Sequence, residues 1–167
     1  MSTSVPSSNG TKETTFGTYS VAYDGKHGLF AMKGGSVSSK DGSNRWLWVI
    51  QSINEKKIYT INETAKTCSV SPLPVLPVVC IPESASYVYS NPSKYNGKEI
   101  MTDTWFVESQ GSFTYTTVTR DDLCIPVSVG VSVPDTGINS SQTYTQFEAK
   151  IKDKTIIKVP KECSGVN

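Results

Sequence analysis

The chain has 167 residues and a formal net charge of +1, and its lysines and arginines are scattered without a basic run. This charge distribution gives no support for a nucleic-acid partner or for binding to an anionic membrane surface. No apolar stretch approaches the roughly 20 residues that a membrane-spanning helix needs. The length suits one domain that buries a real hydrophobic core.

The N-terminal segment is polar and lacks the charged and apolar regions of a visible signal peptide. We expect residues 1–13 to be disordered, residues 14–163 to form a single β domain, and residues 164–167 to be a short tail. Either the protein is cytosolic or the chain is a trimmed secretory protein. The even number of cysteines and three N-glycosylation sequons, at Asn9, Asn62 and Asn139, favour secretion.

Threonine, valine, serine and tyrosine are frequent, which is typical of β structure. Alternating apolar and polar residues predict strands that we place, in chain order, at residues 18–23, 45–53, 58–62, 99–109, 112–120, 125–133, 142–151 and 154–159. Between the second and third of these, residues 54–57 predict a hairpin turn. The chain as a whole indicates about nine or ten short strands in an antiparallel sandwich or open barrel.

Residues 69–84 carry four prolines, which exclude a central strand and predict an extended surface loop. The same segment contains a PxxP pattern at residues 74–77, which is typical of polyproline ligands. An ordered crossover loop is the better interpretation, because a single PxxP pattern is weak evidence.

The residues give little support for catalysis. His27 is the only histidine and follows a predicted Asp24-Gly25 turn, where a solvated side chain is expected. The four cysteines are too far apart in sequence for the close ligand pairs of most zinc sites. No pair of carboxylates and no glycine-rich phosphate loop stands out. We therefore expect a protein that is not an enzyme and requires no cofactor.

Several motifs in order resemble one known family. They are "VAYDG", "RWLWVIQSINEKKIYTIN" followed by "ETAKTC", "IPESAS", "TWFVES", "LCIPVSV" and "VPKEC". Together they resemble the ependymin-related family of secreted glycoproteins, over residues 19–163. The resemblance implies an all-β fold of two stacked, strongly curved antiparallel sheets, a half-open barrel or sandwich that encloses a hydrophobic pocket. In this architecture the family is similar to bacterial lipoprotein carriers.

The resemblance also bears on the cysteines. The family pattern pairs the cysteine after the hairpin with one near the C-terminus, which implies a Cys68–Cys163 bridge here. It pairs the cysteine of the "CIPVS" motif with one near the N-terminus, but this sequence has no cysteine before Cys68. The extra cysteine at Cys80 suggests a rerouted Cys80–Cys124 bridge. The competing interpretation is that an upstream cysteine is missing from this chain and that Cys80 is unpaired.

Two functions follow as hypotheses. The first is a secreted glycoprotein that binds a fatty acid or another lipid in a pocket between its sheets. Large residues from several strands, with small residues between them, are the candidates for the lining: Trp46, Trp48, Trp105, Phe113, Tyr115, Val127, Val129 and Phe147. The second is a structural glycoprotein of the extracellular matrix that takes part in cell–matrix adhesion.

The family resemblance further implies a homodimer, an association with calcium and an extracellular location, with the lysosome as an alternative. Calcium is the single cofactor that we consider. Its weak candidate ligands are Asp121, Asp122 and Asp135, which sit at the predicted ends of strands. Solvated turn carboxylates are the simpler interpretation of these three residues.

Overall fold

The structure is a computed structural model, and it describes residues 2–6, 12–73, 80–95, 97–121 and 124–163. The chain divides into two compact units. Unit 1 comprises Met1–Phe16 and Val78–Glu148, and unit 2 comprises Gly17–Pro77 and Ala149–Asn167. Each unit is built on an antiparallel sheet, and neither sheet closes into a barrel. The all-β class and the two antiparallel sheets are therefore confirmed.

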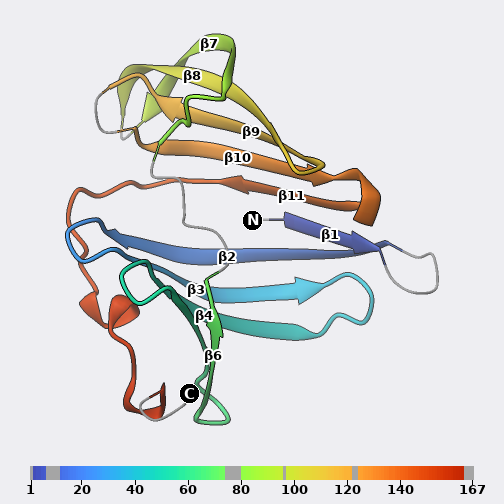
Figure 1. Cartoon of the computed structure of the whole chain (residues 1–167), viewed down its shortest axis with the longest axis vertical. Helices are drawn as coiled ribbons and strands as arrows, with labels where there is room; N and C mark the ends of the chain where they lie inside the picture. The colour runs from blue at the N-terminus through green and yellow to red at the C-terminus, as the bar shows by residue number, and fades with distance from the viewer. Residues whose placement is uncertain (1, 7–11, 74–79, 96, 122–123, 164–167) are drawn as a thin grey trace. The chain divides into compact units, whose positions relative to one another are not determined.

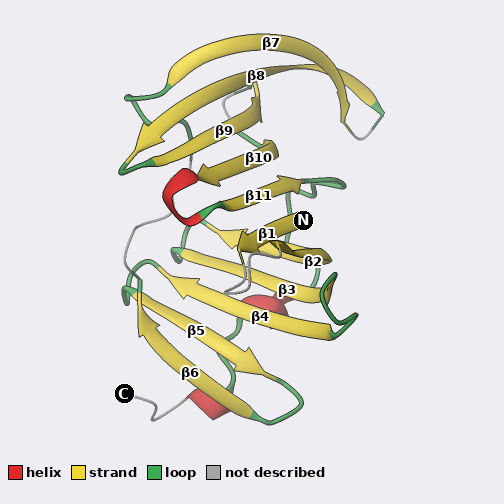
Figure 2. Cartoon of the chain, turned by 90° about the vertical axis from the view of Figure 1, so that its right-hand side faces the viewer, coloured by secondary structure: helices red, strands yellow, loops and turns green. Residues whose placement is uncertain are grey.

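Unit 1 contains the beginning of β2 and six further strands. Its strands are β1 (Ser2–Pro6), β7 (Ser86–Tyr95), β8 (Lys98–Ser109), β9 (Ser112–Thr119), β10 (Pro126–Val133) and β11 (Ile138–Thr143), with the 3₁₀ turn η1 (Pro134–Thr136) between the last two. Their order in the sheet is β2-β1-β11-β10-β9-β8-β7. Strands β7 and β8 are strongly curved (Figure 2).

The register of unit 1 places two rows of residues across one face of the sheet. Phe113 lies opposite Ser132, which lies opposite Asn139. In the neighbouring row, Tyr115 lies opposite Gly130, and Gly130 lies opposite Ser141. Since side chains alternate along a strand, Thr116 and its partner Val129 point to the other face. A bulge between Pro126 and Ser128 shifts the register at the start of β10.

Unit 2 contains the rest of β2 (Lys12–Asp24) and four strands in the order β2-β3-β4-β5-β6 (Figures 1 and 2). These are β3 (Leu29–Ser38), β4 (Asn44–Ser52), β5 (Lys57–Asn62) and β6 (Thr67–Pro72). The chain then returns at its C-terminus with two 3₁₀ turns, η2 (Lys154–Ile157) and η3 (Lys161–Cys163).

The hydrophobic core of unit 2 lies between its sheet and this C-terminal segment. Ala31 and Ile50 have an exposed fraction of 0%, and they are opposite each other on β3 and β4. Ile156 of η2 packs against this cluster from the C-terminal segment. The indole Nε1 of Trp48 donates a hydrogen bond to the carbonyl oxygen of Ile156 at 2.9 Å. The segment thus covers one face of the sheet with both apolar contacts and a polar anchor.

One disulfide lies within each unit. Cys68 on β6 is bonded to Cys163 in η3, with 5.1 Å between their Cα atoms. Cys80 is bonded to Cys124, with 5.8 Å between their Cα atoms. These are the two pairs that the family resemblance and the extra cysteine suggested, and no cysteine is free among them.

The structure differs from the predicted secondary structure at both ends. Residues 2–6 and 12–13, expected to be disordered, are in β1 and β2, where β-branched residues pair with neighbouring strands. Two closing strands were predicted wrongly. Within 142–151 only the first two residues are in a strand, and 154–159 is largely the turn η2.

The proline-rich segment agrees only in part with the expected loop. Its first residues, through Pro72, belong to β6, which is the edge strand of unit 2 and therefore tolerates a proline. Residues 74–79, including the PxxP pattern, lie outside the described residues, as do the tail at 164–167 and the sequon at Asn9.

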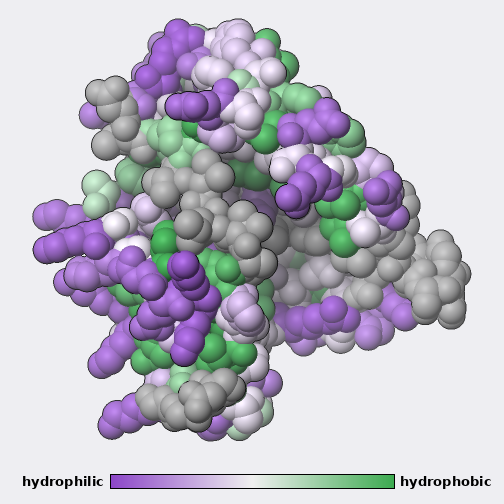
Figure 3. Space-filling model, viewed as in Figure 1, coloured by the Kyte–Doolittle hydropathy of each residue, from purple (hydrophilic) through white to green (hydrophobic). Residues whose placement is uncertain are grey.

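The surface mixes hydrophilic residues with separate hydrophobic patches (Figure 3). Several large apolar side chains are exposed, and Trp46 is the extreme case with an exposed fraction of 73%. Within the described part of the chain, no helix has the length and apolar character to cross a membrane.

Candidate functional site

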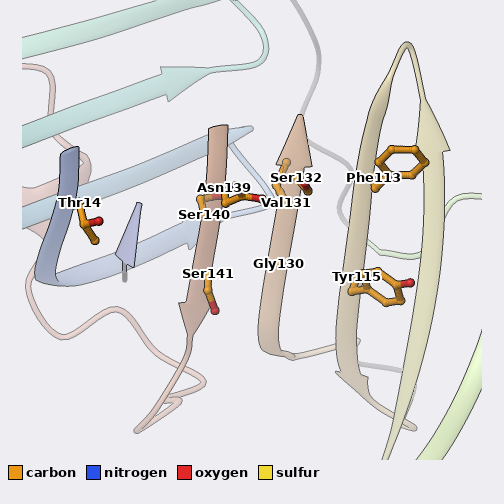
Figure 4. A pocket seen from close by; sticks show the side chains of 9 residues that line it. All are labelled: Thr14, Phe113, Tyr115, Gly130, Val131, Ser132, Asn139, Ser140 and Ser141. Carbon is orange, nitrogen blue, oxygen red and sulfur yellow. The ribbon is translucent and has the colours of Figure 1, made fainter. Parts of the chain in front are cut away.

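A pocket of about 420 Å³ lies on one face of the unit 1 sheet. Nine residues from β2, β9, β10 and β11 line it (Figure 4): Thr14, Phe113, Tyr115, Gly130, Val131, Ser132, Asn139, Ser140 and Ser141. Most of its lining surface is apolar, and none of these nine residues carries a charged side chain. The pocket is open to solvent rather than enclosed.

One side of the pocket is aromatic. The ring of Phe106 on β8 lies 6.0 Å from that of Phe113 and 5.0 Å from that of Tyr115, measured between centroids. These distances are typical of aromatic pairs that stabilise each other. Tyr115 nevertheless keeps an exposed fraction of 52%. Phe106 therefore supports a wall whose outer ring remains available to a ligand.

The floor of the pocket is made by β10. Gly130 lies between Tyr115 and Ser141 in the register, and a Cβ atom added to it would meet no heavy atom within 4 Å. The missing side chain therefore leaves a gap between the aromatic wall on β9 and the polar residues of β11. Ser132, Asn139 and Ser141 provide hydroxyl and amide groups on the same face.

The structure brings only two of the eight predicted pocket residues together. Phe113 and Tyr115 line the pocket, and they were predicted to share a face of their strand. Val127 and Val129 do not line it, and Val129 belongs to the opposite face of the sheet. Trp105 lies on that opposite face too, since its partner is Thr116.

The remaining predicted residues are elsewhere. Trp105 packs edge-on against Tyr87 at 5.6 Å. Trp46 and Trp48 belong to unit 2, where the Nζ of Lys33 lies 4.2 Å from the centroid of the Trp48 ring. Phe147 follows β11 and has an exposed fraction of 37%. Trp48 thus contributes to the core of unit 2, and its role there is structural.

The polar side of the pocket was not predicted from the sequence. Asn139, Ser140 and Ser141 lie on β11, and its sequence "INSSQT" has almost no apolar alternation. Exposed and half-buried residues alternate along β11, but this pattern is visible only once the strand pairing is known. Gly130 and Ser132 both belong to the pocket face.

The calcium candidates are not brought together in the described residues. The hydroxyl of Thr119 donates to the Oδ1 of Asp121 at 2.5 Å. Asp135 is exposed in η1, and Asp122 lies outside the described residues. Among the side chains that the structure describes, no three histidine, cysteine, aspartate or glutamate residues form a group that could hold a metal ion.

The only histidine lies in the hairpin turn between β2 and β3. The Nδ1 of His27 is 2.7 Å from the Oδ2 of Asp24, and the His27 backbone N–H donates to the other oxygen of Asp24 at 3.2 Å. The hydrogen bond from His27 lowers the pKa of the Asp24 carboxyl below its ordinary value. Both residues belong to unit 2 rather than to the pocket, and their hydrogen bonds stabilise the turn.

Two sequon asparagines are described. Asn62 ends β5, and its Oδ1 accepts a hydrogen bond from the backbone N–H of Ala65 at 3.0 Å, within an exposed turn. Asn139 lies on β11 in the pocket, where its Nδ2 donates to the carbonyl oxygen of Gly137 at 3.2 Å. Both side chains are exposed, so neither position is sterically closed.

Residues 42–163 match the sequence model of the ependymin family, a region that includes most of both sheets and all four cysteines. The chain belongs to the ependymin family. Membership confirms the resemblance that the ordered motifs indicated. A comparison with curated proteins finds no match. The ependymin family and the two disulfides are consistent with an extracellular glycoprotein-type protein, because disulfides persist in oxidising compartments.

Proposed function

We propose that this ependymin-family protein is a secreted, non-catalytic carrier that binds a hydrophobic small molecule, such as a fatty acid, in the aromatic pocket of unit 1. The observation that carries the proposal is the aromatic wall formed by half-buried Phe113 and exposed Tyr115 beside the open floor at Gly130. The pocket volume of about 420 Å³ is in the range of small-molecule sites.

The lining supports a ligand with one polar end. Its acyl chain would lie against Phe113 and Tyr115, while a hydroxyl or carboxyl group would accept or donate hydrogen bonds at Ser132 and Ser141. The absence of a charge among the nine described lining residues favours hydrogen bonding over ion pairing. A charged headgroup would extend into solvent through the open side.

The expected affinity is moderate. A buried methylene group contributes about 0.8 kcal/mol, but an open pocket buries only part of an acyl chain. Association also costs several kcal/mol of translational and rotational freedom. These opposing terms are compatible with dissociation constants of about 1 μM, which correspond to roughly 8 kcal/mol.

Fluorescence titration with a fluorescent long-chain fatty acid tests the proposal. Tyr115→Ala removes the exposed ring, and Gly130→Val places a side chain where an added Cβ atom would meet no heavy atom within 4 Å, so each should weaken binding about tenfold. Trp46→Ala is the matched control, because it removes an even more exposed aromatic ring from unit 2. Equal affinities for the wild type, Tyr115→Ala and Gly130→Val would contradict the proposed site.

A second proposal, a matrix or adhesion glycoprotein associated with calcium, is favoured by one observation. Strand β7 is the edge of the unit 1 sheet, and it exposes Tyr87, Val88 and Tyr89. Exposed aromatic side chains at a sheet edge suit contact with another protein or a second copy of this chain. Sedimentation velocity with and without calcium tests this proposal, which predicts larger species in calcium. An unchanged monomer would contradict it.

A further inference from the structure

Asn139 combines two properties on one side chain. It is the acceptor of an Asn-Ser-Ser sequon, and it lines the aromatic pocket. The other described sequon, at Asn62, lies in a turn of unit 2 and outside the pocket. A glycan on Asn139 would therefore begin at the pocket itself.

The pairing of β9, β10 and β11 sets the distance that the first sugar must extend from Asn139 to the aromatic side of the pocket. Asn139 is two strands away from Phe113, with Ser132 between them. Two strand spacings are roughly 9.6 Å. Open space lies at Gly130, in the neighbouring row between Tyr115 and Ser141, where an added Cβ atom would meet no heavy atom within 4 Å. A pyranose ring attached to Asn139 would have to extend from β11 toward this space.

We propose that the first N-acetylglucosamine of a glycan on Asn139 occupies the aromatic pocket and closes it to the hydrophobic ligand. Exclusion of the ligand by the sugar rests on the proposed function, whereas the position of the sugar in the pocket does not. The carrier would then exist in two forms, a ligand-binding form without a glycan at Asn139 and a closed form with one.

The attachment chemistry is that of the secretory pathway. The Nδ2 of Asn139 forms a bond to C1 of the sugar, the bond from C1 to the lipid-pyrophosphate carrier breaks, and Nδ2 loses one proton. Nδ2 keeps its second hydrogen, so its hydrogen bond to the carbonyl oxygen of Gly137 is compatible with glycosylation. This bond holds the amide against the backbone at Gly137, just before β11 begins.

The pocket surfaces suit an N-acetylglucosamine ring. A pyranose has one face of C–H groups, which packs on an exposed aromatic ring such as Tyr115. Its hydroxyl and acetamido groups form hydrogen bonds, for which Ser132 and Ser141 are available donors and acceptors. The arrangement of an aromatic wall opposite hydroxyl groups therefore fits a sugar as well as an acyl chain.

The experiment uses the full chain with Asn139 as its single sequon, in an Asn9→Gln/Asn62→Gln background. One sample is secreted from eukaryotic cells and trimmed by endoglycosidase H to one N-acetylglucosamine. The other comes from the bacterial periplasm, where disulfides form and no glycan is added. The matched control carries Asn62 as its single sequon, in an Asn9→Gln/Asn139→Gln background, and is prepared in the same two ways.

We expect a nuclear Overhauser effect between the acetamido methyl group and the Tyr115 ring, and about tenfold weaker binding of the fluorescent fatty acid in the trimmed Asn139 form. The control forms should bind the probe equally. Absence of the Overhauser effect would overturn the inference, as would mass spectrometry that finds Asn139 unmodified after secretion. If neither form binds the probe, the proposed function fails, while the Overhauser effect still decides where the sugar lies.

Discussion

Asp103 on β8 organises a polar network at the edge of the unit 1 sheet. Arg120 donates to Asp103 from Nε at 3.0 Å and from its terminal nitrogen at 2.6 Å, and Ser90 donates at 2.6 Å. The Asp103 side chain is mostly buried, with an exposed fraction of 14%. The hydrogen bonds from Arg120 are the main reason that the pKa of Asp103 lies below its ordinary value of 3.8.

This lowered pKa predicts a pH-dependent contribution to stability. The contribution is fully present above 3.8, the value for the unfolded chain, and it is lost as the pH falls through the lower pKa of the folded state. Asp103→Asn should therefore be less stable than the wild type at pH 7, and the difference should shrink below pH 4. Urea denaturation at several pH values measures it, with Asp135→Asn as an exposed control. A difference that is independent of pH would contradict the prediction.

Gly34 on β3 is fixed by a close approach of the backbone of β2. A Cβ atom at Gly34 would clash with the carbonyl oxygen of Thr18, whereas one at Gly35 would meet its nearest atom at 3.9 Å. Gly34→Ala should therefore destabilise the protein by about 1–3 kcal/mol, the usual cost of overpacking. The adjacent Gly35→Ala is the matched control.

The free energy of unfolding, measured by urea denaturation, distinguishes the two variants. Gly35→Ala should change it little, because the added methyl group makes only ordinary contacts. If both variants lose the same stability, the contact with Thr18 is not the cause of the loss.

At the scale of elements, the Cys68–Cys163 disulfide holds the C-terminal segment against β6. The bond spans 95 residues, and the loop-entropy model gives it about 4.7 kcal/mol. Cys68→Ala/Cys163→Ala should lose about this free energy of unfolding. It should also raise the rate of amide hydrogen exchange in η2, because only apolar contacts and the hydrogen bond from Trp48 would still hold Ile156.

The other disulfide supplies the comparison. Cys80–Cys124 spans 44 residues and lies in unit 1, so the same model gives it about 4.0 kcal/mol. Cys80→Ala/Cys124→Ala should leave the exchange rates in η2 unchanged. Equal exchange in η2 for the two double variants would show that the terminal bridge is not what holds the segment.

The sequence predicted the strands whose apolar residues alternate regularly. Strands β4, β5, β8, β9 and β10 lie close to their expected ranges. It did not predict β3, where Lys33 and two adjacent glycines interrupt the apolar pattern. It also did not predict β7, which contains Pro92; the proline is tolerated there because β7 is an edge strand. A strand was predicted at η2 because its two isoleucines are apolar. An apolar segment can pack on the face of a sheet without forming hydrogen bonds to its strands, and η2 does so.

The candidate site was predicted only on its aromatic side. Alternation showed that Phe113 and Tyr115 share a face, but it does not show which strands are neighbours. The pairing of β10 with β11 decides that Asn139 and Ser141 join the site and that Val129 does not. Register of this kind depends on contacts between distant parts of the chain, so a single sequence does not contain it in readable form.

For the whole molecule, family membership and composition predicted the all-β class, but not the division into two units. Unit 2 combines residues 17–77 with the returning segment 149–167, and unit 1 combines the N-terminal strand with residues 78–148. Each unit has its own sheet and its own disulfide. Local sequence patterns indicate which residues share a face of a strand. The division into two units depends instead on contacts between distant segments, such as residues 17–77 and 149–167.

The location of the ligand in unit 1 is the claim on which the carrier hypothesis depends. Photocrosslinking with a long-chain fatty acid that carries a diazirine near the middle of its chain, followed by trypsin digestion and mass spectrometry, tests it most directly. We predict label in the peptides 99–120 and 121–150, which contain Phe113, Tyr115, Gly130 and Asn139. Label concentrated in residues 46–56, around Trp46 and Trp48, or no label above that of an unrelated protein, would contradict the account.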